Sequence, residues 1–328
     1  MRFSILLSLL LLFSSLSYSQ SLNIIYASDN NESGFFQIYT MDDFGNNVKQ
    51  MTDMPYHCQM PHWSQDGKKI VFNTDEPCIY LIEDADTDTP SNPIYLHFGY
   101  NAVFTPEGNE IIFNSEYEGF QGTYVMSLED YEVYPLSSEV YSNQQVLSDD
   151  GTKLVYSAIY KGTKCIMLTD LNDTTDNDTY KISINSDSNL EPDISSDNNM
   201  IVYASFNLHL KGTIYLYKYG TEKALTKGIS SSNQPRFSYD DDKIAFVVIE
   251  EKSVNLWVTN IDGGNRKEIK TKGGSLRTFK WIDNDWILYD AGEGNSINIY
   301  LVNTVTGENV ALTNKGNNIH PDFLYTEQ

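Results

Sequence analysis

The sequence predicts an all-β fold, a seven-bladed β-propeller whose blades are four-stranded antiparallel sheets. A segment that reads as two short strands joined by a turn recurs along the chain. Successive copies lie roughly 40–45 residues apart, a period typical of propeller blades. No stretch after residue 19 sustains the 3.6-residue periodicity of a helix. A six-bladed ring is the alternative.

The repeat is clearest in Pro61–Phe72, where a strand ending at Trp63 is followed by an Asp66-Gly67 turn and a second strand. Asp-Gly favours a two-residue hairpin turn because glycine adopts a positive φ without steric cost. We align the copies on the residue seven positions before the second strand. These anchors are Trp63, Phe104, Leu147, Ile194, Phe237, Lys280 and Phe323.

Residues 1–19 have the pattern of a secretory signal peptide. Arg2 precedes an apolar run from Ile5 to Phe13, and Ser17 and Ser19 suit a cleavage site. The run is too short to span a bilayer, and no other apolar stretch approaches about 18 residues. We therefore expect a single propeller domain over residues 20–328, with no transmembrane segment, in the periplasm or secreted.

The first blade lacks its innermost strand, and the end of the chain offers a replacement. Ile24–Tyr26, Ile38-Tyr39 and Lys49–Thr52 match the second, third and fourth strands of the repeat. His320–Phe323 matches the start of the motif but no second strand follows it. We expect this segment to close the ring within blade 1, because an open ring leaves two sheet edges unpaired.

The Pro61–Phe72 segment, with later Ile-Tyr and Leu-Thr pairs in the blades, resembles the repeats of TolB-like propellers. The resemblance covers nearly all of residues 20–328. It implies a periplasmic or secreted propeller that engages another macromolecule. TolB carries an α/β domain before a six-bladed propeller, whereas here the repeats begin directly after residue 19 and seven blades are counted.

The charge balance limits the kinds of partner. The 45 acidic and 22 basic residues give a net charge of −23. Nucleic acid is disfavoured, because each phosphate contact needs Lys or Arg. Anionic lipid surfaces and polyanionic glycans are disfavoured for the same reason. We expect a protein kept monomeric by its charge.

The sequence contains no motif that assigns a catalytic residue, a metal or a cofactor. It lacks a nucleophile elbow, His-Glu-x-x-His, a phosphate-binding glycine loop and Cys-x-x-Cys. Asp84–Asp88 has carboxylates at calcium-loop spacing but lacks the Gly and Glu such loops need. We interpret it, and the cluster Asp170, Asp173, Asp176 and Asp178, as solvated loops on the propeller rim.

The three cysteines are Cys58, Cys78 and Cys165. In an exported protein one disulfide and one buried thiol are the expected partition. Cys58 precedes the first strand of blade 2 and Cys78 opens its third strand, on the same face. We therefore expect a Cys58–Cys78 disulfide, with Cys165 reduced.

The most informative positions lie three residues before each anchor, at the mouth of the innermost strand. Six of the seven are polar, and together they include an acid, a guanidinium, an imidazole and three amides. We call this set the mouth ring: Met60, Asn101, Gln144, Glu191, Gln234, Arg277 and His320. Convergent polar groups around a concave opening favour binding, although polar residues also fill any wet channel mouth. We expect Arg277 to be the main anchor of a partner.

Two classes of function remain. The first is a binding or scaffold propeller for a protein or envelope component. The alternative is a propeller enzyme acting on carbohydrate, because oligogalacturonate lyases have related propellers with a histidine-bound metal. Such a site needs several His ligands and cations, whereas only His320 lies in the ring, near His57 and His62. Binding is therefore favoured. A peptidase-regulating propeller would need a hydrolase domain that these residues do not contain.

Overall fold

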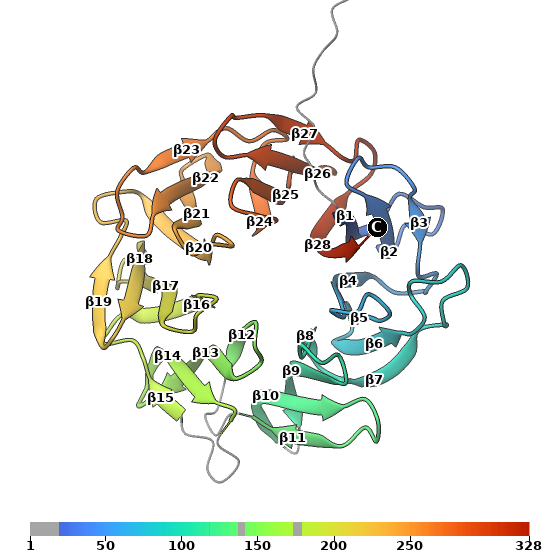
Figure 1. Ribbon diagram of the computed structural model, residues 1–328, viewed down its shortest axis with the longest axis horizontal. Helices are drawn as coiled ribbons and strands as arrows, with labels where there is room; N and C mark the ends of the chain where they lie inside the picture. Colours follow the sequence, from blue (N-terminus) through green and yellow to red (C-terminus); the bar gives the residue numbers. More distant parts are fainter. Residues whose placement is uncertain (1–19, 118, 137–141, 173–178, 328) are drawn as a thin grey trace, which may run out of the picture.

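The computed structural model describes residues 20–117, 119–136, 142–172 and 179–327, which form a ring of seven blades around a central channel (Figure 1). Each blade is a four-stranded antiparallel sheet, so the seven-bladed prediction is confirmed. Within these residues there is no helix with the length and hydrophobicity needed to cross a bilayer. The predicted signal peptide, residues 1–19, lies outside the described residues.

From the channel outward, each blade contributes four strands. Blade 1 consists of β28 (Asn318–Glu327), β1 (Gln20–Ser28), β2 (Gln37–Asp42) and β3 (Lys49–Gln50). Blades 2 and 3 consist of β4 (Cys58–Trp63), β5 (Ile70–Thr74), β6 (Cys78–Ile82) and β7 (Ile94–Phe98), then β8 (Tyr100–Phe104), β9 (Glu110–Tyr117), β10 (Phe120–Ser127) and β11 (Val133–Pro135). Blades 4 and 5 consist of β12 (Asn143–Leu147), β13 (Lys153–Tyr160), β14 (Thr163–Asp170) and β15 (Thr179–Lys181), then β16 (Ser188–Ile194), β17 (Met200–Phe206), β18 (Gly212–Lys218) and β19 (Thr221–Ala224). Blades 6 and 7 consist of β20 (Ser231–Phe237), β21 (Lys243–Glu250), β22 (Ser253–Asn260) and β23 (Lys267–Ile269), then β24 (Leu276–Trp281), β25 (Trp286–Glu293), β26 (Ser296–Asn303) and β27 (Asn309–Ala311).

The chain end closes the ring as predicted. Strand β28 pairs antiparallel with β1, from Gln20 opposite Glu327 to Ser28 opposite Asn318, and lies beside it in Figure 1. Just beyond the paired segment, Asp29 accepts hydrogen bonds from the backbone and side-chain N–H groups of Asn317 at 2.6 and 2.7 Å. Blade 1 is therefore assembled from the two ends of the propeller.

Apolar layers between neighbouring blades form the core. The layer between blades 7 and 1, for example, contains Ile24, Tyr26 and Tyr39 from one blade and Leu288 and Ile299 from the other. In blades 1, 2, 5 and 7 the aromatic residue of the second strand stacks on the tyrosine opposite it in the third, as Tyr26 does on Tyr39 at 5.8 Å. Such cross-strand pairs stabilise the sheet.

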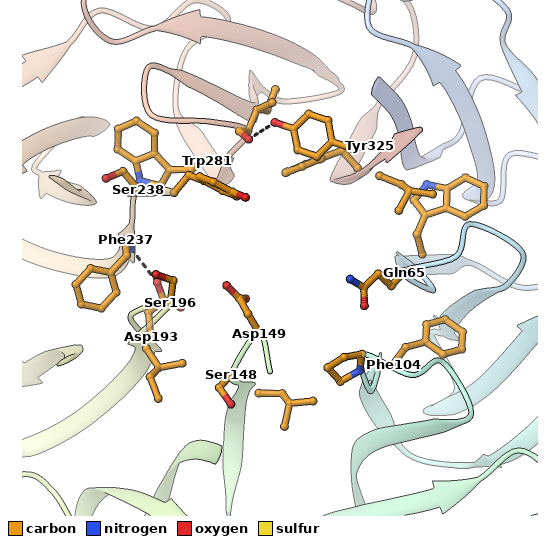
Figure 2. Close-up of a pocket in the computed structure, with 18 of the residues that line it drawn as sticks. Gln65, Phe104, Ser148, Asp149, Asp193, Ser196, Phe237, Ser238, Trp281 and Tyr325 are labelled. Atoms are coloured by element: carbon orange, nitrogen blue, oxygen red, sulfur yellow. Dashed lines mark hydrogen bonds between the residues drawn. The ribbon is translucent and has the colours of Figure 1, made fainter. Parts of the chain in front are cut away.

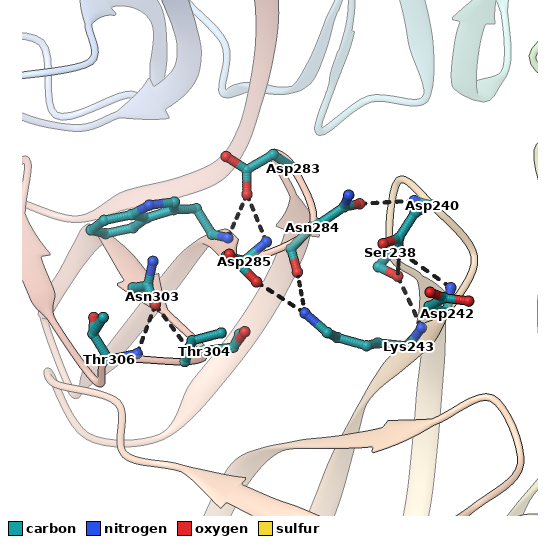
Figure 3. Close-up of polar contacts among 12 residues, drawn as sticks. Ser238, Asp240, Asp242, Lys243, Asp283, Asn284, Asp285, Asn303, Thr304 and Thr306 are labelled. Atoms are coloured by element: carbon teal, nitrogen blue, oxygen red, sulfur yellow. Dashed lines mark hydrogen bonds and ion pairs between the residues drawn. The ribbon is translucent and has the colours of Figure 1, made fainter. Parts of the chain in front are cut away.

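The turns between first and second strands are longer than the predicted two-residue hairpins. The N–H of Ser64 donates to the carbonyl of Lys69 across four residues, and only Gly67 among those four has a positive φ, of 70°. Side chains stabilise these turns: in blade 6 the hydroxyl of Ser238 donates to Asp240 at 2.8 Å and accepts from the N–H of Lys243 at 3.0 Å (Figure 3). A local Ser–Asp hydrogen bond of this kind is present in the turns of blades 2, 4, 5 and 6.

Blade 7 departs from the sequence alignment by one residue. Its turn is shorter, because the N–H of Ile282 donates to the carbonyl of Trp286 across three residues. Asp283 accepts from the N–H groups of Asp285 and Trp286, both at 2.7 Å (Figure 3). Trp281, which pairs with Ile287 as Trp63 pairs with Ile70, is therefore the anchor in this blade, and the assignment of Lys280 was wrong.

The predicted Cys58–Cys78 disulfide is not present, and all three cysteines are free. Cys58 lies on β4 opposite Thr74 of β5, and Cys78 begins β6 on the far side of β5. Strands two apart in a sheet are separated by about 9.6 Å, beyond the roughly 7 Å that a disulfide allows between Cα atoms. The two cysteines lie at the same end of blade 2, but on strands that are not neighbours.

Candidate functional site

The mouth ring is brought together at one end of the channel, at bulges in the innermost strands. In the five blades 2 to 6 the ladder shifts register there, for instance between Gln59 and His62, and β1 shows the matching shift opposite His320. The ring residues at these bulges have φ values between 50° and 55°: Met60, Asn101, Gln144, Glu191, Gln234 and His320. Left-handed backbone is uncommon for residues other than glycine, so its repetition shows that the tertiary structure imposes it.

Arg277 occupies a different position from the other ring residues. The bulge of β24 lies between Leu276 and Thr278, and Arg277 is the extra residue. Because the turn of blade 7 is one residue shorter, Thr278 is the residue three before the anchor Trp281. The predicted equivalence of Arg277 with the other ring residues is therefore wrong by one position, yet its side chain is exposed at the mouth.

In blades 4 to 6 the ring side chains connect neighbouring blades. Oε1 of Gln144 accepts the N–H of Glu191 at 3.0 Å, and Oε2 of Glu191 accepts the N–H of Gln234 at 2.7 Å. A bulge removes an N–H from the strand ladder, and the preceding blade satisfies it here. Burial raises the pKa of Glu191, against the hydrogen bond from Gln234 and the charge of Arg236. Gln144 and Glu191 therefore have structural roles.

A second polar cluster, two residues further along the innermost strands, links blades 7, 1 and 2. Asp322 of β28 binds Lys280 of β24 at 2.6 Å and Nδ1 of His62 of β4 at 2.7 Å. The Asp322 side chain is only 13% exposed. Burial alone would raise the pKa of its carboxyl, but Lys280 and His62 hold that pKa well below its usual range. The ion pairs therefore join the closing strand to both neighbouring blades.

His320, the mouth-ring residue of blade 1, lies near the buried carboxyl of Asp290. Oδ1 of Asp290, which is fully buried, accepts the N–H of Thr278 at 2.8 Å. Within the described part of the chain, Oδ2 of Asp290 and Nδ1 of His320 have no hydrogen-bond partner. Burial, followed by the charges of His62 and Arg277, lowers the pKa of His320 to about 4. His320 is therefore a neutral imidazole near pH 7, within electrostatic reach of Arg277.

A cavity of about 690 Å³ occupies the opposite end of the channel, beside the turns (Figure 2). Anchor residues such as Phe104, Phe237 and Trp281 form its wall. Its acidic lining residues are Asp149, Asp193 and Asp241. Its lining residues include no Lys, Arg or His. Burial raises the pKa of Asp193 to about 6, opposed by Arg236. The channel is thus acidic and aromatic at the turn end, whereas Arg277, Lys280 and His62 lie toward the mouth.

The histidines near the mouth do not converge as metal ligands. Nδ1 of His57 accepts the N–H of Phe36 at 3.0 Å, and His62 is bound to Asp322. Over the described ranges, no group of three or more His, Cys, Asp or Glu side chains is placed to hold a metal ion. Asp173, Asp176 and Asp178 of the second acidic loop lie outside those ranges.

Solved structures with the same fold include TolB from Acinetobacter baumannii, with a TM-score of 0.56 and 17% identity over 92% of this chain and 66% of that chain. A puromycin-hydrolyzing peptidase from Mycobacterium tuberculosis gives a TM-score of 0.69 and 12% identity, over 89% of this chain and 52% of that chain. The propeller domain of the Trilobed protease from Pyrococcus furiosus, with its open velcro topology, gives a TM-score of 0.63 and 17% identity, over 89% of this chain and 92% of that chain. No protein-family model and no curated protein matches the sequence.

The chain spans about two thirds of the TolB chain and about half of the peptidase chain. Identities this low establish a common fold. The expected resemblance to TolB propellers is confirmed at that level. The Trilobed protease propeller has an open velcro topology, whereas in this chain β28 pairs with β1. In fold, the chain is a closed seven-bladed β-propeller similar to the propellers of TolB and of these peptidases.

Proposed function

We propose that the protein is an exported binding or scaffold propeller that docks a protein partner of the cell envelope on its mouth face. We define the mouth face as the loops that precede the innermost strands together with the loops between second and third strands. It contains the mouth ring, and its loops differ from blade to blade. The opposite face carries the short repeated turns, which offer less to distinguish one partner from another.

The observation that carries the proposal is the β17–β18 loop on the mouth face of blade 5. Leu208 is 99% exposed and Leu210 is 80% exposed. The loop is held by its own hydrogen bonds, since the side chain of Asn207 accepts the N–H groups of His209 and Lys211. Two leucines presented to water on an ordered loop are typical of a surface that another protein covers.

Propeller neighbours of both kinds, TolB and peptidases, are consistent with a module that engages another polypeptide. The carbohydrate-enzyme alternative has no observation of its own in its favour, because His57 and His62 are both engaged within the fold. The mouth ring residues Asn101, Gln144, Glu191, Gln234, Arg277 and His320 remain part of the proposed docking face. In blades 4 and 5 one side-chain oxygen of Gln144 and one of Glu191 are already engaged by the N–H of the next blade.

The proposal is tested by quantitative co-purification from cells that produce the protein. Replacing Leu208 and Leu210 together by Ser should reduce the recovered partner, because these changes remove exposed apolar area without touching the core. Tyr219→Ser is the matched control, since Tyr219 is 74% exposed in the β18–β19 turn on the opposite face. Loss of the partner in the control but not in the leucine variant would contradict the proposal.

A further inference from the structure

The innermost strands of blades 6, 7, 1 and 2 carry basic side chains in a strongly acidic protein. Residues 20–328 contain three arginines, and two of them, Arg236 and Arg277, lie on innermost strands. Lys280, His62 and His320 lie on innermost strands as well. The net charge of the whole chain is −23, so basic groups gathered around the channel stand out. Each such group is expected to pair with an anionic group.

Most of these basic groups already have such a partner. Lys280 and His62 share the carboxylate of Asp322. Arg236 donates to the carbonyl of Pro235 at 2.7 Å and acts electrostatically on Glu191 and Asp193. These groups are therefore already engaged within the fold.

Arg277 differs from all of them. Its side chain is exposed, and it forms no hydrogen bond or ion pair with any residue in the described ranges. Asp290 of the same blade is fully buried, accepts hydrogen bonds from the backbone N–H and the hydroxyl of Thr278, and forms no ion pair with Arg277 in the described residues. Glu293 packs against Gly274, near the start of β24, but makes no ion pair with Arg277 in that part of the structure. The guanidinium is therefore free at the channel mouth.

We propose that Arg277, the exposed guanidinium at the mouth of blade 7, forms a carboxylate-binding site that takes an acidic side chain of the protein partner. The inference rests on the proposed function, because it names the group that the mouth face would recognise. A guanidinium presents paired N–H donors that match a carboxylate in a bidentate arrangement. A carboxylate of the partner would supply the negative charge with which Arg277 forms an ion pair, because no described residue supplies one.

A peptide acid fits this sector better than a sugar acid. The ring residue of blade 2, which follows blade 1 and its His320 around the channel, is Met60; it is 37% exposed and offers an apolar contact on the same face. A sugar acid would instead need polar partners for its hydroxyls next to the carboxylate, which the thioether side chain of Met60 does not offer. We therefore expect an acidic residue flanked by apolar residues.

The experiment uses two short peptides, acetylated and amidated at their ends, that differ only in Glu or Gln between two leucines. Binding to residues 20–328 is measured by NMR, following the side-chain Nε–H signal of Arg277 and the imidazole of His320. We expect the Glu peptide to shift both signals saturably and to bind about tenfold more tightly than the Gln peptide. Arg277→Gln should remove this difference. Arg266→Gln, an exposed arginine on the outer part of blade 6, should preserve it.

Equal binding of the two peptides, absence of a saturable shift, or an unchanged difference in Arg277→Gln would overturn the proposal. A galacturonate dimer serves as a third probe. If it bound more tightly than the Glu peptide and equally depended on Arg277, the assignment to a peptide acid would be wrong. This outcome is distinguishable from failure of the proposed docking face. If co-purification needs Leu208 and Leu210 but not Arg277, the docking face is supported and the carboxylate site is contradicted.

Discussion

Replacing Asp322 by Asn should destabilise the closed ring, because it leaves Lys280 and His62 without their shared carboxylate. The side chains are 13%, 39% and 25% exposed, respectively. Breaking a fully buried pair costs about 3–5 kcal/mol, and an exposed pair is worth at most about 1 kcal/mol. For this partly buried cluster we expect a loss of about 2 kcal/mol in the free energy of unfolding.

The effect should depend on pH with a definite sign. The pKa of Asp322 is lower in the folded protein than its unfolded value of about 3.9. Its contribution to stability is therefore fully present above about pH 4 and is lost as the pH falls below that value. The difference in the free energy of unfolding between wild type and Asp322→Asn should have its full value near neutral pH and become smaller below about pH 4.

Urea unfolding followed by circular dichroism measures this difference at each pH. Asp285→Asn is the matched control, because it removes an ion pair to Lys243 in which the acid is 49% exposed; we expect less than about 1 kcal/mol. Equal effects of the two substitutions at neutral pH, or an Asp322→Asn effect that persists undiminished at low pH, would refute the reasoning.

Three further predictions concern the closing strand, the link between blades 4 and 5, and the cysteines. Deleting residues 318–327 removes β28 and its ladder to β1, with hydrogen bonds worth about 1 kcal/mol each; an unchanged, cooperative melting transition would show that the ring closes otherwise. Gln144→Ala leaves the N–H of Glu191 without its acceptor and should cost about 1–2 kcal/mol, whereas a similar loss in Asn101→Ala would argue against a specific link between blades 4 and 5. Under native conditions a thiol reagent should modify Cys78 only, because Cys58 and Cys165 are buried and burial raises the pKa of Cys58 to about 12; mass spectrometry of the labelled protein checks this.

The fold was predictable because the repeat combines strands, turn formers and a period that few other architectures share. Ring closure was predictable from the unpaired copy at His320–Phe323. The alignment failed only in blade 7, where it assumed a constant turn length. Trp281 is aromatic like Trp63, so matching side-chain type rather than spacing would have found the right anchor.

The candidate site was predictable in place but not in chemistry. The repeat located the mouth ring, yet nothing in it showed that Gln144 and Glu191 accept the backbone N–H of the next blade, because the bulge that frees that N–H is a tertiary feature. The cluster of Asp322, His62 and Lys280 was missed. Complementary charges at the same repeat position in neighbouring blades, as in His62 and Asp322, were the available signal. The prediction of a disulfide failed because two residues at the same end of a blade need not lie on adjacent strands.

Photo-crosslinking from the two ends of the channel tests most directly whether the partner docks on the mouth face. A photoreactive amino acid replaces Met60 at the mouth in one variant and Tyr239 at the turn end in the other; both native side chains are exposed. Irradiation in cells that produce the protein should give a protein adduct from position 60 and none from position 239. An adduct from position 239 alone would place the partner on the turn face and contradict the account.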